Sequence, residues 1–253
     1  MTDHGLMKLG RRRGDAPDPR IRPLARYGAT DALAPPAIDW FARVPAWPML
    51  ANDTVGDCTV AAIGHVIQQW TTYTDAQAVV MGDAAVLAAY SAIAGYRPGD
   101  PASDRGAACS AALRYWIVAG VATPDGGPDT LTGAASLDPR DLEAVRGAIA
   151  TFGALYAGVA LPLSAQREEV WGATTDAPGS WGGHCVPLVG YDARGPICVT
   201  WGGLKRMTWA WWATYAEEAY ALLSPDWVGA RGLDPAGLDW ALLAADMMAL
   251  RMG

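Results

Sequence analysis

The spacing of apolar residues changes near residue 154, and this change restricts the folds open to the chain. Before it, apolar residues recur at the three- and four-residue intervals of helices. The expected helices span 58–73, 84–94, 108–118 and 140–151. After it, Leu155–Leu161 is typical of a strand, and the apolar runs 184–192 and 196–202 predict a β-hairpin. A mainly helical half followed by a mainly β half predicts an α+β protein of two lobes with a cleft between them.

The remaining segments carry weaker signals. The Pro-, Gly- and Asp-rich stretch 124–137 is expected to be a loop, and residues 162–183 a long polar connection. Thr208 can cap a helix over 209–223, and Pro235 can begin a last helix that runs to about residue 251.

Residues 1–37 differ in composition from the rest. Arginines alternate there with prolines, which remove backbone donors and favour extended conformations, so an irregular basic arm is expected. Residues 1–28 contain seven Lys or Arg and three Asp, a net charge of +4, so the rest carries −11 of the total −7. The arm is either a solvated tail or is held by the acidic body or by an assembly partner. The negative charge of the body argues against nucleic acid as a partner of the body itself.

We therefore expect three parts. The arm spans 1–37, a two-lobe domain spans 38–225, and a helical extension spans 226–253. Within the domain, the helical lobe covers about 38–140 and the β-rich lobe about 141–225.

Cys58 is the first candidate for chemistry. It lies where a polar, Gly-containing turn meets the expected helix 58–73. The unpaired N–H groups and positive dipole end of a helix favour the thiolate over the thiol. Asp57 could cap the helix, and its charge would partly oppose this effect. The alternative is that Cys58 is a small buried core residue.

Other polar residues are assigned simpler roles. His65 lies two helical turns from Cys58, about 10 Å away, so we expect a core histidine. Cys109, Cys185 and Cys198 are expected to be core thiols, and Asp192 a turn residue. The cysteines show no zinc-type spacing and the chain has no phosphate-binding Gly-rich loop, so we expect no metal and no cofactor. Most of the twelve tryptophans should be core residues; a glycan-stacking surface is the alternative.

The order of the candidate residues resembles that of the papain-like cysteine peptidases. His184 opens a strand 126 residues after Cys58, and Trp201-Gly202 follows the next strand. Ile38-Asp39-Trp40 resembles the opening of the mature papain chain, and Asn52 stands six residues before Cys58, where the family has its oxyanion-hole glutamine. Further resemblances lie in 106–121, 142–161, Gly183–Val186 and Val189–Tyr191, so the likeness covers about residues 38–203.

This resemblance implies a papain-like two-lobe fold and acyl transfer. Cys58 would be the nucleophile, His184 the general base, and Asn52 with the Cys58 N–H the oxyanion hole. The sequence departs from the family at the asparagine that orients the histidine, because Val199 occupies the aligned position. Thr200 is the candidate replacement, although a hydroxyl orients a histidine less well than an amide does. Val55 and Thr59 also replace family residues near the nucleophile, which suggests a divergent branch found in bacteria and phages.

Two functions follow. The first is a cysteine peptidase or amidase acting on a peptide, a protein or a peptidoglycan amide. The second is a catalytically weak or inactive structural protein of a phage virion or similar assembly, docked by residues 1–37. We find no signal peptide and no apolar run of membrane-spanning length, so we expect a cytoplasmic or virion-associated protein with no membrane partner.

Overall fold

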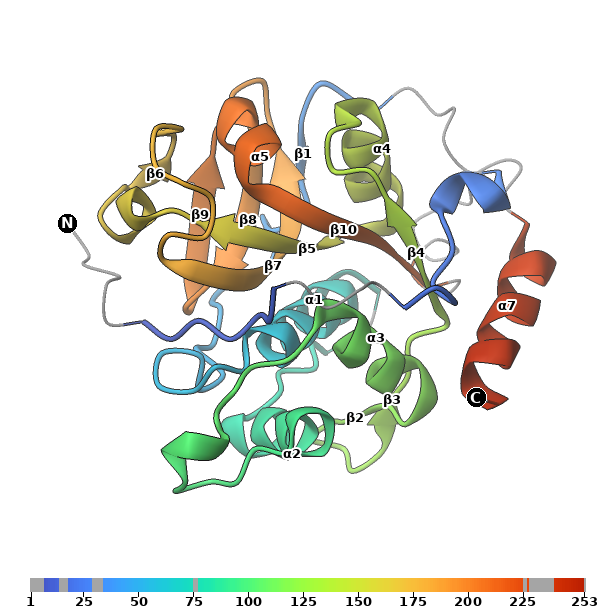
Figure 1. Cartoon of the computed structure of the whole chain (residues 1–253). Helices are drawn as coiled ribbons and strands as arrows, with labels where there is room; N and C mark the ends of the chain where they lie inside the picture. The colour runs from blue at the N-terminus through green and yellow to red at the C-terminus, as the bar shows by residue number, and fades with distance from the viewer. Residues whose placement is uncertain are drawn as a thin grey trace.

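The computed structural model describes residues 7–13, 18–28, 34–74, 77–224, 227 and 239–252. Figure 1 shows a lower, mainly helical half and an upper half built on a large sheet, with the N-terminal segment running between them. This arrangement confirms the predicted α+β architecture of two lobes.

The helical lobe contains α1 (Cys58–Thr74), α2 (Asp83–Ala94) and α3 (Cys109–Val118). The first thirteen residues of α1 are all buried, because this helix lies between the other helices and strand β7 of the sheet. Gly95 ends α2 in a left-handed conformation with φ +70°, which suits a residue without Cβ. Smaller elements of this region are η2 (Pro101–Ser103), β2 (Val121–Ala122) and β3 (Pro128–Asp129).

The second lobe is built on one sheet. Its strand order is β4-β10-β5-β7-β8-β9-β6, and β1 also pairs with β7. The strands are β1 (Ile38–Asp39), β4 (Gly133–Leu137), β5 (Leu155–Leu161), β6 (Val170–Trp171), β7 (Gly182–Tyr191), β8 (Pro196–Thr200), β9 (Gly203–Met207) and β10 (Ala216–Leu223). All of these pairs are antiparallel except β6 with β9. Helix α4 (Leu142–Phe152) packs on the central strands, and α5 (Trp209–Tyr215) packs on β5.

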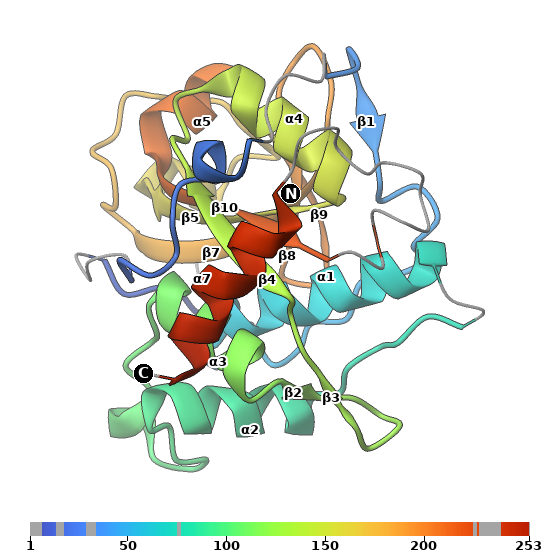
Figure 2. The same ribbon diagram turned by 90° about the vertical axis from the view of Figure 1, so that its right-hand side faces the viewer.

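Residues outside the two lobes complete the fold. Helix α7 (Trp240–Met252) buries Leu243, Met247 and Leu250, and it packs against α3, β4 and η1 (Leu24–Tyr27), as Figure 2 shows for α3 and β4. The 3-10 helix η3 (Leu163–Gln166) lies within the second lobe, between β5 and β6. The start that we expected for the last helix, at Pro235, lies outside the described residues.

Two predictions of secondary structure were wrong. The expected helix 209–223 ends at Tyr215, and residues 216–223 form β10, an inner strand between β4 and β5. Thr208 does cap α5, because its hydroxyl accepts a hydrogen bond from the Trp211 N–H. The expected loop 124–137 contains β3 and the sheet strand β4. Strands β4 and β10 pair with strands distant in the sequence, and this pairing overrides the local signal, whereas β3 pairs with the nearby β2.

The tryptophans confirm the core assignment. Trp116, Trp171, Trp211, Trp212 and Trp227 are fully buried. Indole N–H groups donate to backbone carbonyls in several of them, for example from Trp212 to Pro139 at 2.7 Å and from Trp171 to Ala165 at 3.1 Å. Trp211 is an exception, because its Nε1 has no hydrogen-bond partner in the described part of the chain.

Candidate active site

Cys58 is the first residue of α1 and is buried at the junction of the two lobes. The turn before it is strained: Leu50 and Ala51 have φ +58° and +61°, which residues with a Cβ adopt rarely. Burial raises the pKa of Cys58 to about 12, and backbone hydrogen bonds at Cys185 and Gly10 offset this only in part. In this structure, the increase in the Cys58 pKa caused by burial is larger than any decrease caused by the N-terminus of α1, so Cys58 is a neutral thiol at pH 7.

His184 lies in β7, and the structure brings it together with Thr200 of β8. Its Nε2 is 2.7 Å from Thr200 Oγ1, and its ring stacks on Trp201 with centroids 4.6 Å apart and an interplanar angle of 16°. Trp201 has φ +46°, so the backbone is strained directly after Thr200. Burial lowers the pKa of His184 to about 3, and its buried Nδ1 has no hydrogen-bond partner among the described residues.

Asn52 lies beside Asp57 rather than in an open position. Its Nδ2 donates to Val55 O at 3.3 Å and to Asp57 Oδ1 at 3.0 Å, so both amide hydrogens are used. The carboxyl of Asp57 faces Asn52, and among the described residues it accepts no hydrogen bond from the first N–H groups of α1. Burial raises the pKa of Asp57 to about 8, and its Oδ2 has no partner within the described chain.

The other sequence candidates occupy the simpler roles. His65 Nε2 lies 2.9 Å from the Pro48 carbonyl oxygen and is buried, which confirms a core histidine. Cys109, Cys185 and Cys198 are free and buried. Asp192 accepts hydrogen bonds from the N–H groups of Arg194 and Gly195, as a turn residue does. Among the described residues, no group of three or more His, Cys, Asp or Glu could hold a metal ion.

The N-terminal segment crosses the junction between the lobes and hydrogen-bonds to both. Arg11 N donates to Gly183 O at 3.2 Å in the β-rich lobe. Gly10 O accepts from Ala107 N at 2.8 Å, and Arg12 N donates to Ala107 O at 2.9 Å, just before α3 in the helical lobe. Figure 1 shows this segment passing above α1 and below β7. Residues 8–12 are therefore bound in the cleft as an extended peptide; we call them the cleft segment.

The cleft segment lies so close to the surrounding backbone that glycine is required both within the segment and in the lobes that contact it. A Cβ on Gly10 would lie 1.7 Å from the carbonyl oxygen of Gly56, two residues before Cys58. A Cβ on Gly183 would lie 2.3 Å from Arg11 O, and one on Gly106 would lie 2.1 Å from Gly10 O. The cleft thus accepts a peptide backbone in direct contact with its own backbone.

Glutamates of β10 hold the cleft segment by charge. Arg11 pairs with Glu217 and with Glu218 at 2.6 Å each, and Arg13 also pairs with Glu217. The described part of the basic arm is therefore held by the acidic body of the same chain, which is one of the alternatives expected from the sequence. The local sequence pattern predicted a helix over 209–223, so it did not place Glu217 and Glu218 on a sheet strand beside Arg11.

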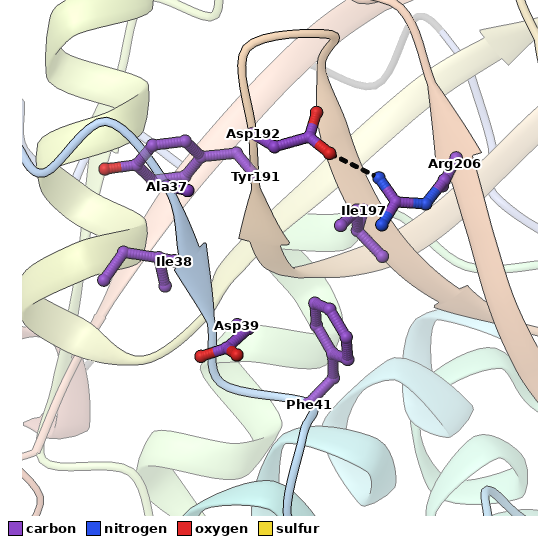
Figure 3. A pocket seen from close by; sticks show the side chains of 8 residues that line it. All are labelled: Ala37, Ile38, Asp39, Phe41, Tyr191, Asp192, Ile197 and Arg206. Atoms are coloured by element: carbon purple, nitrogen blue, oxygen red, sulfur yellow. Dashed lines mark hydrogen bonds and ion pairs between the residues drawn. The ribbon is translucent and has the colours of Figure 1, made fainter.

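A separate pocket lies away from these residues. It has a volume of about 360 Å³ and is lined by residues of β1, β7, β8 and β9 together with Ala37, Phe41 and Asp192. Asp192 forms an ion pair with Arg206 there (Figure 3). None of the residues assigned to catalysis lines it.

The fold can be compared with that of known proteins. No family model and no curated protein matches the sequence. Xylellain, a cysteine protease from Xylella fastidiosa, has a TM-score of 0.66 at 16% identity, over 87% of this chain and 97% of its own. The cysteine protease CMS1MS2 of Carica candamarcensis has a TM-score of 0.55 at 15% identity, over 75% and 99%. Procathepsin L 3 of Tenebrio molitor has a TM-score of 0.57 at 13% identity, over 88% and 78%. The chain therefore has the papain-like two-lobe fold that these cysteine proteases share.

Proposed function

We propose that this chain is a cysteine peptidase or amidase that is held latent by its own cleft segment. The observation that carries the proposal is the environment of His184. Its Nε2 is fixed by Thr200 and its ring by Trp201, while its Nδ1 has no hydrogen-bond partner in the part of the chain that the structure describes. A histidine held in this way is suited to exchange a proton at Nδ1.

The proposed chemistry begins when a peptide replaces the cleft segment. Cys58 Sγ attacks the substrate carbonyl carbon, and its proton passes to Nδ1 of His184. The Thr200 hydroxyl accepts a hydrogen bond from Nε2–H, which selects the tautomer with an unprotonated Nδ1. The imidazolium then returns the proton to the leaving amine, which leaves a thioester on Cys58. Water activated by the neutral His184 hydrolyses the thioester and releases the acid.

The developing oxyanion needs donors. The Cys58 backbone N–H at the start of α1 is one of them. Asn52 supplies the second if its amide turns away from Asp57, to which it donates in the closed form. Removal of the cleft segment is therefore expected to rearrange this pair.

Latency accounts for the electrostatics of the site. The cleft segment helps to bury Cys58, whose pKa is about 12, while that of His184 is about 3, so neither carries charge at pH 7. Admission of water after the segment leaves favours the charged forms. Two similar structures are named as proenzymes, a procathepsin L and a procathepsin B.

Peptides and proteins are the substrates that we propose, with peptidoglycan amides as a narrower case. The divergent branch of bacterial and phage proteins remains a proposal based on the departures at Val55, Thr59 and Val199.

The second candidate is a structural protein without activity, such as a virion component. The neutral Cys58 and His184 and the engaged amide of Asn52 favour it. The seating of Arg11 in the chain's own cleft speaks against an arm that docks elsewhere.

The test uses a full-length variant, Gly10→Ala with Arg11→Ala, which removes both the close fit to Gly56 and the ion pairs to β10. We call it the arm-release variant. A mixture of synthetic peptides is incubated with it, and cleavage is read by mass spectrometry. We expect cleavage that disappears when Cys58→Ala or His184→Ala is added. Cleavage that survives both substitutions, or no cleavage by a folded arm-release variant, would contradict the proposal.

A further inference from the structure

The side chain of Arg11 lies in a pocket over the paired strands β5 and β10, against Gly158 and Glu218. Only 5% of this side chain is exposed. Its Nε donates to Glu218 Oε1 at 2.6 Å, and an Nη donates to Glu217 Oε2 at 2.6 Å. The guanidinium is thus bound by two carboxylates from one strand that lies more than 200 residues away in the sequence.

The pocket is shaped for this group. Tyr220 OH donates to Glu218 Oε2 at 2.6 Å and so fixes the carboxylate that meets Nε. Gly158 of β5 pairs with Glu218 of β10, and a Cβ on Gly158 would lie 2.3 Å from Arg11 Nε. Without a side chain at position 158, the stem of a long side chain can reach the glutamates.

The position of the pocket relates it to the proposed chemistry. Arg11 N donates to Gly183 O, and Gly183 directly precedes His184. Gly10, the neighbour of Arg11, forms a backbone hydrogen bond at Cys58 and lies against Gly56. In a peptide bound as the cleft segment is, one residue faces Cys58 and the side chain of the adjacent residue enters the pocket.

Charge decides which side chain the pocket accepts. Burial alone would raise the pKa of Glu217, but hydrogen bonds from Arg13 and Arg11 lower it below its ordinary value. When the cleft segment leaves, both carboxylates lose the guanidinium of Arg11. Partly buried carboxylates without a cation are unfavourable. A planar guanidinium can bond both at once, whereas an ammonium acts as a single point charge.

We infer that this pocket, formed by Gly158, Glu217, Glu218 and Tyr220, selects substrates with an arginine next to the residue that faces Cys58. Lysine binds there less well, and neutral or acidic side chains are disfavoured. The inferred substrate preference rests on the proposed function, whereas the binding of arginine in the pocket can be tested without any catalysis.

The binding test uses the full-length arm-release variant with Cys58→Ala, so that no peptide is cleaved. The probes are the fluorescein-labelled peptide Met-Lys-Leu-Gly-Arg-Arg-Arg, which is the sequence of residues 7–13, and copies with norleucine or glutamate at the fifth position. We expect the arginine peptide to bind at least about tenfold more tightly than the norleucine peptide. Equal binding of these two peptides would overturn the inference.

Two variants assign the effect to the pocket. Glu218→Gln should remove most of the discrimination between arginine and norleucine, whereas Glu143→Gln, an exposed acid on α4, should leave it unchanged. Gly158→Ala keeps both carboxylates but fills the space beside Nε, so it should weaken the arginine peptide specifically. Loss of discrimination in Glu143→Gln as well would mean that overall charge causes it, and would overturn the inference.

Cleavage provides the second readout. The arm-release variant is given fluorogenic peptides with Arg, Lys, Leu or Glu at each position near the cleaved amide, and we expect strong selection for Arg at one position. Cleavage that depends on Cys58 and His184 without this preference would overturn the pocket and leave the proposed function intact. No cleavage, together with arginine binding that is lost in Glu218→Gln, would overturn the proposed function and retain the pocket as a peptide-binding site.

Discussion

The Nε2 atom of His184 lies 2.7 Å from Oγ1 of Thr200. The residue that aligns with the histidine-orienting asparagine of the papain-like peptidases is Val199, which has no polar side chain. Val199 is buried in β8 and pairs with Leu204 of β9. The neighbouring hydroxyl, and not the aligned position, therefore contacts the imidazole.

This contact predicts the effect of Thr200→Val. The isosteric side chain removes the partner of Nε2, so the kcat of the arm-release variant should fall by about 10–100-fold with little change in KM. Thr200→Ser keeps the hydroxyl and should keep most of the activity. Steady-state kinetics on one peptide substrate measure both effects, and an unchanged kcat in Thr200→Val would show that Thr200 does not position His184.

Gly10→Ala alone should open the cleft. The added Cβ would lie 1.7 Å from Gly56 O, so the cleft segment cannot remain seated. Alkylation of Cys58 by iodoacetamide at pH 7 should then become at least about tenfold faster, because the thiol is no longer covered. Gly127→Ala is the control for an added methyl, since nothing lies within 4 Å of that position and its backbone is not left-handed. Equal rates for Gly10→Ala and the unmodified chain would contradict closure by this segment.

Asp57 should make the protein less stable as the pH rises. Its pKa is about 8 in the folded chain and 3.8 as an ordinary carboxyl, so the folded state retains the proton between these values. The stability from this group is complete below about pH 4 and is lost as the pH rises to about 8. Asp57→Asn keeps the acceptor for Asn52 and removes the titration.

Chemical denaturation at two pH values checks this prediction. Asp57→Asn should have nearly the stability of the unmodified chain at pH 4.5 and should be about 2–4 kcal/mol more stable at pH 8. Asp125→Asn, at an exposed position, should show no such difference. The same gain at both pH values would mean that Asp57 does not titrate in this range.

Asn52→Ala should affect stability and catalysis separately. The buried carboxyl of Asp57 loses its donor, which should cost about 1–3 kcal/mol of unfolding free energy. If the amide turns to the oxyanion in the open form, the kcat of the arm-release variant should also fall by about 10²–10³-fold. A stability loss with unchanged kcat would restrict Asn52 to a structural role.

Local patterns predicted much of the fold. Leu155–Leu161 forms a strand with the expected bounds, and α1 begins at Cys58 as expected. The β7–β8 hairpin turns at Asp192, whose side chain bonds the backbone two and three residues ahead. These elements depend on residues near in sequence, so their signals lie within a short window.

Long-range pairing explains what the sequence did not reveal. The segment Ala216–Leu223 is rich in Ala, Leu and Glu, which favour helices, but it lies between β4 and β5. The binding of the Arg11 side chain depends on this strand, because Glu217 and Glu218 belong to it, and Arg11 and Glu218 are 207 residues apart. The order of Cys58, His184 and Thr200 indicated a site, but the bond between His184 and Thr200 depends on the register of β7 against β8, which is irregular between Leu188 and Gly190.

The pH dependence of Cys58 alkylation tests the central claim most directly. The arm-release variant is treated with iodoacetamide between pH 4 and pH 10, with and without His184→Ala, and the adduct on Cys58 is quantified by mass spectrometry. We predict rapid labelling at pH 5–6 that is lost in His184→Ala, because a thiolate–imidazolium pair forms once the cleft is open. Labelling that rises only near pH 8.5, and equally with and without His184, would contradict a catalytic pair of Cys58 and His184.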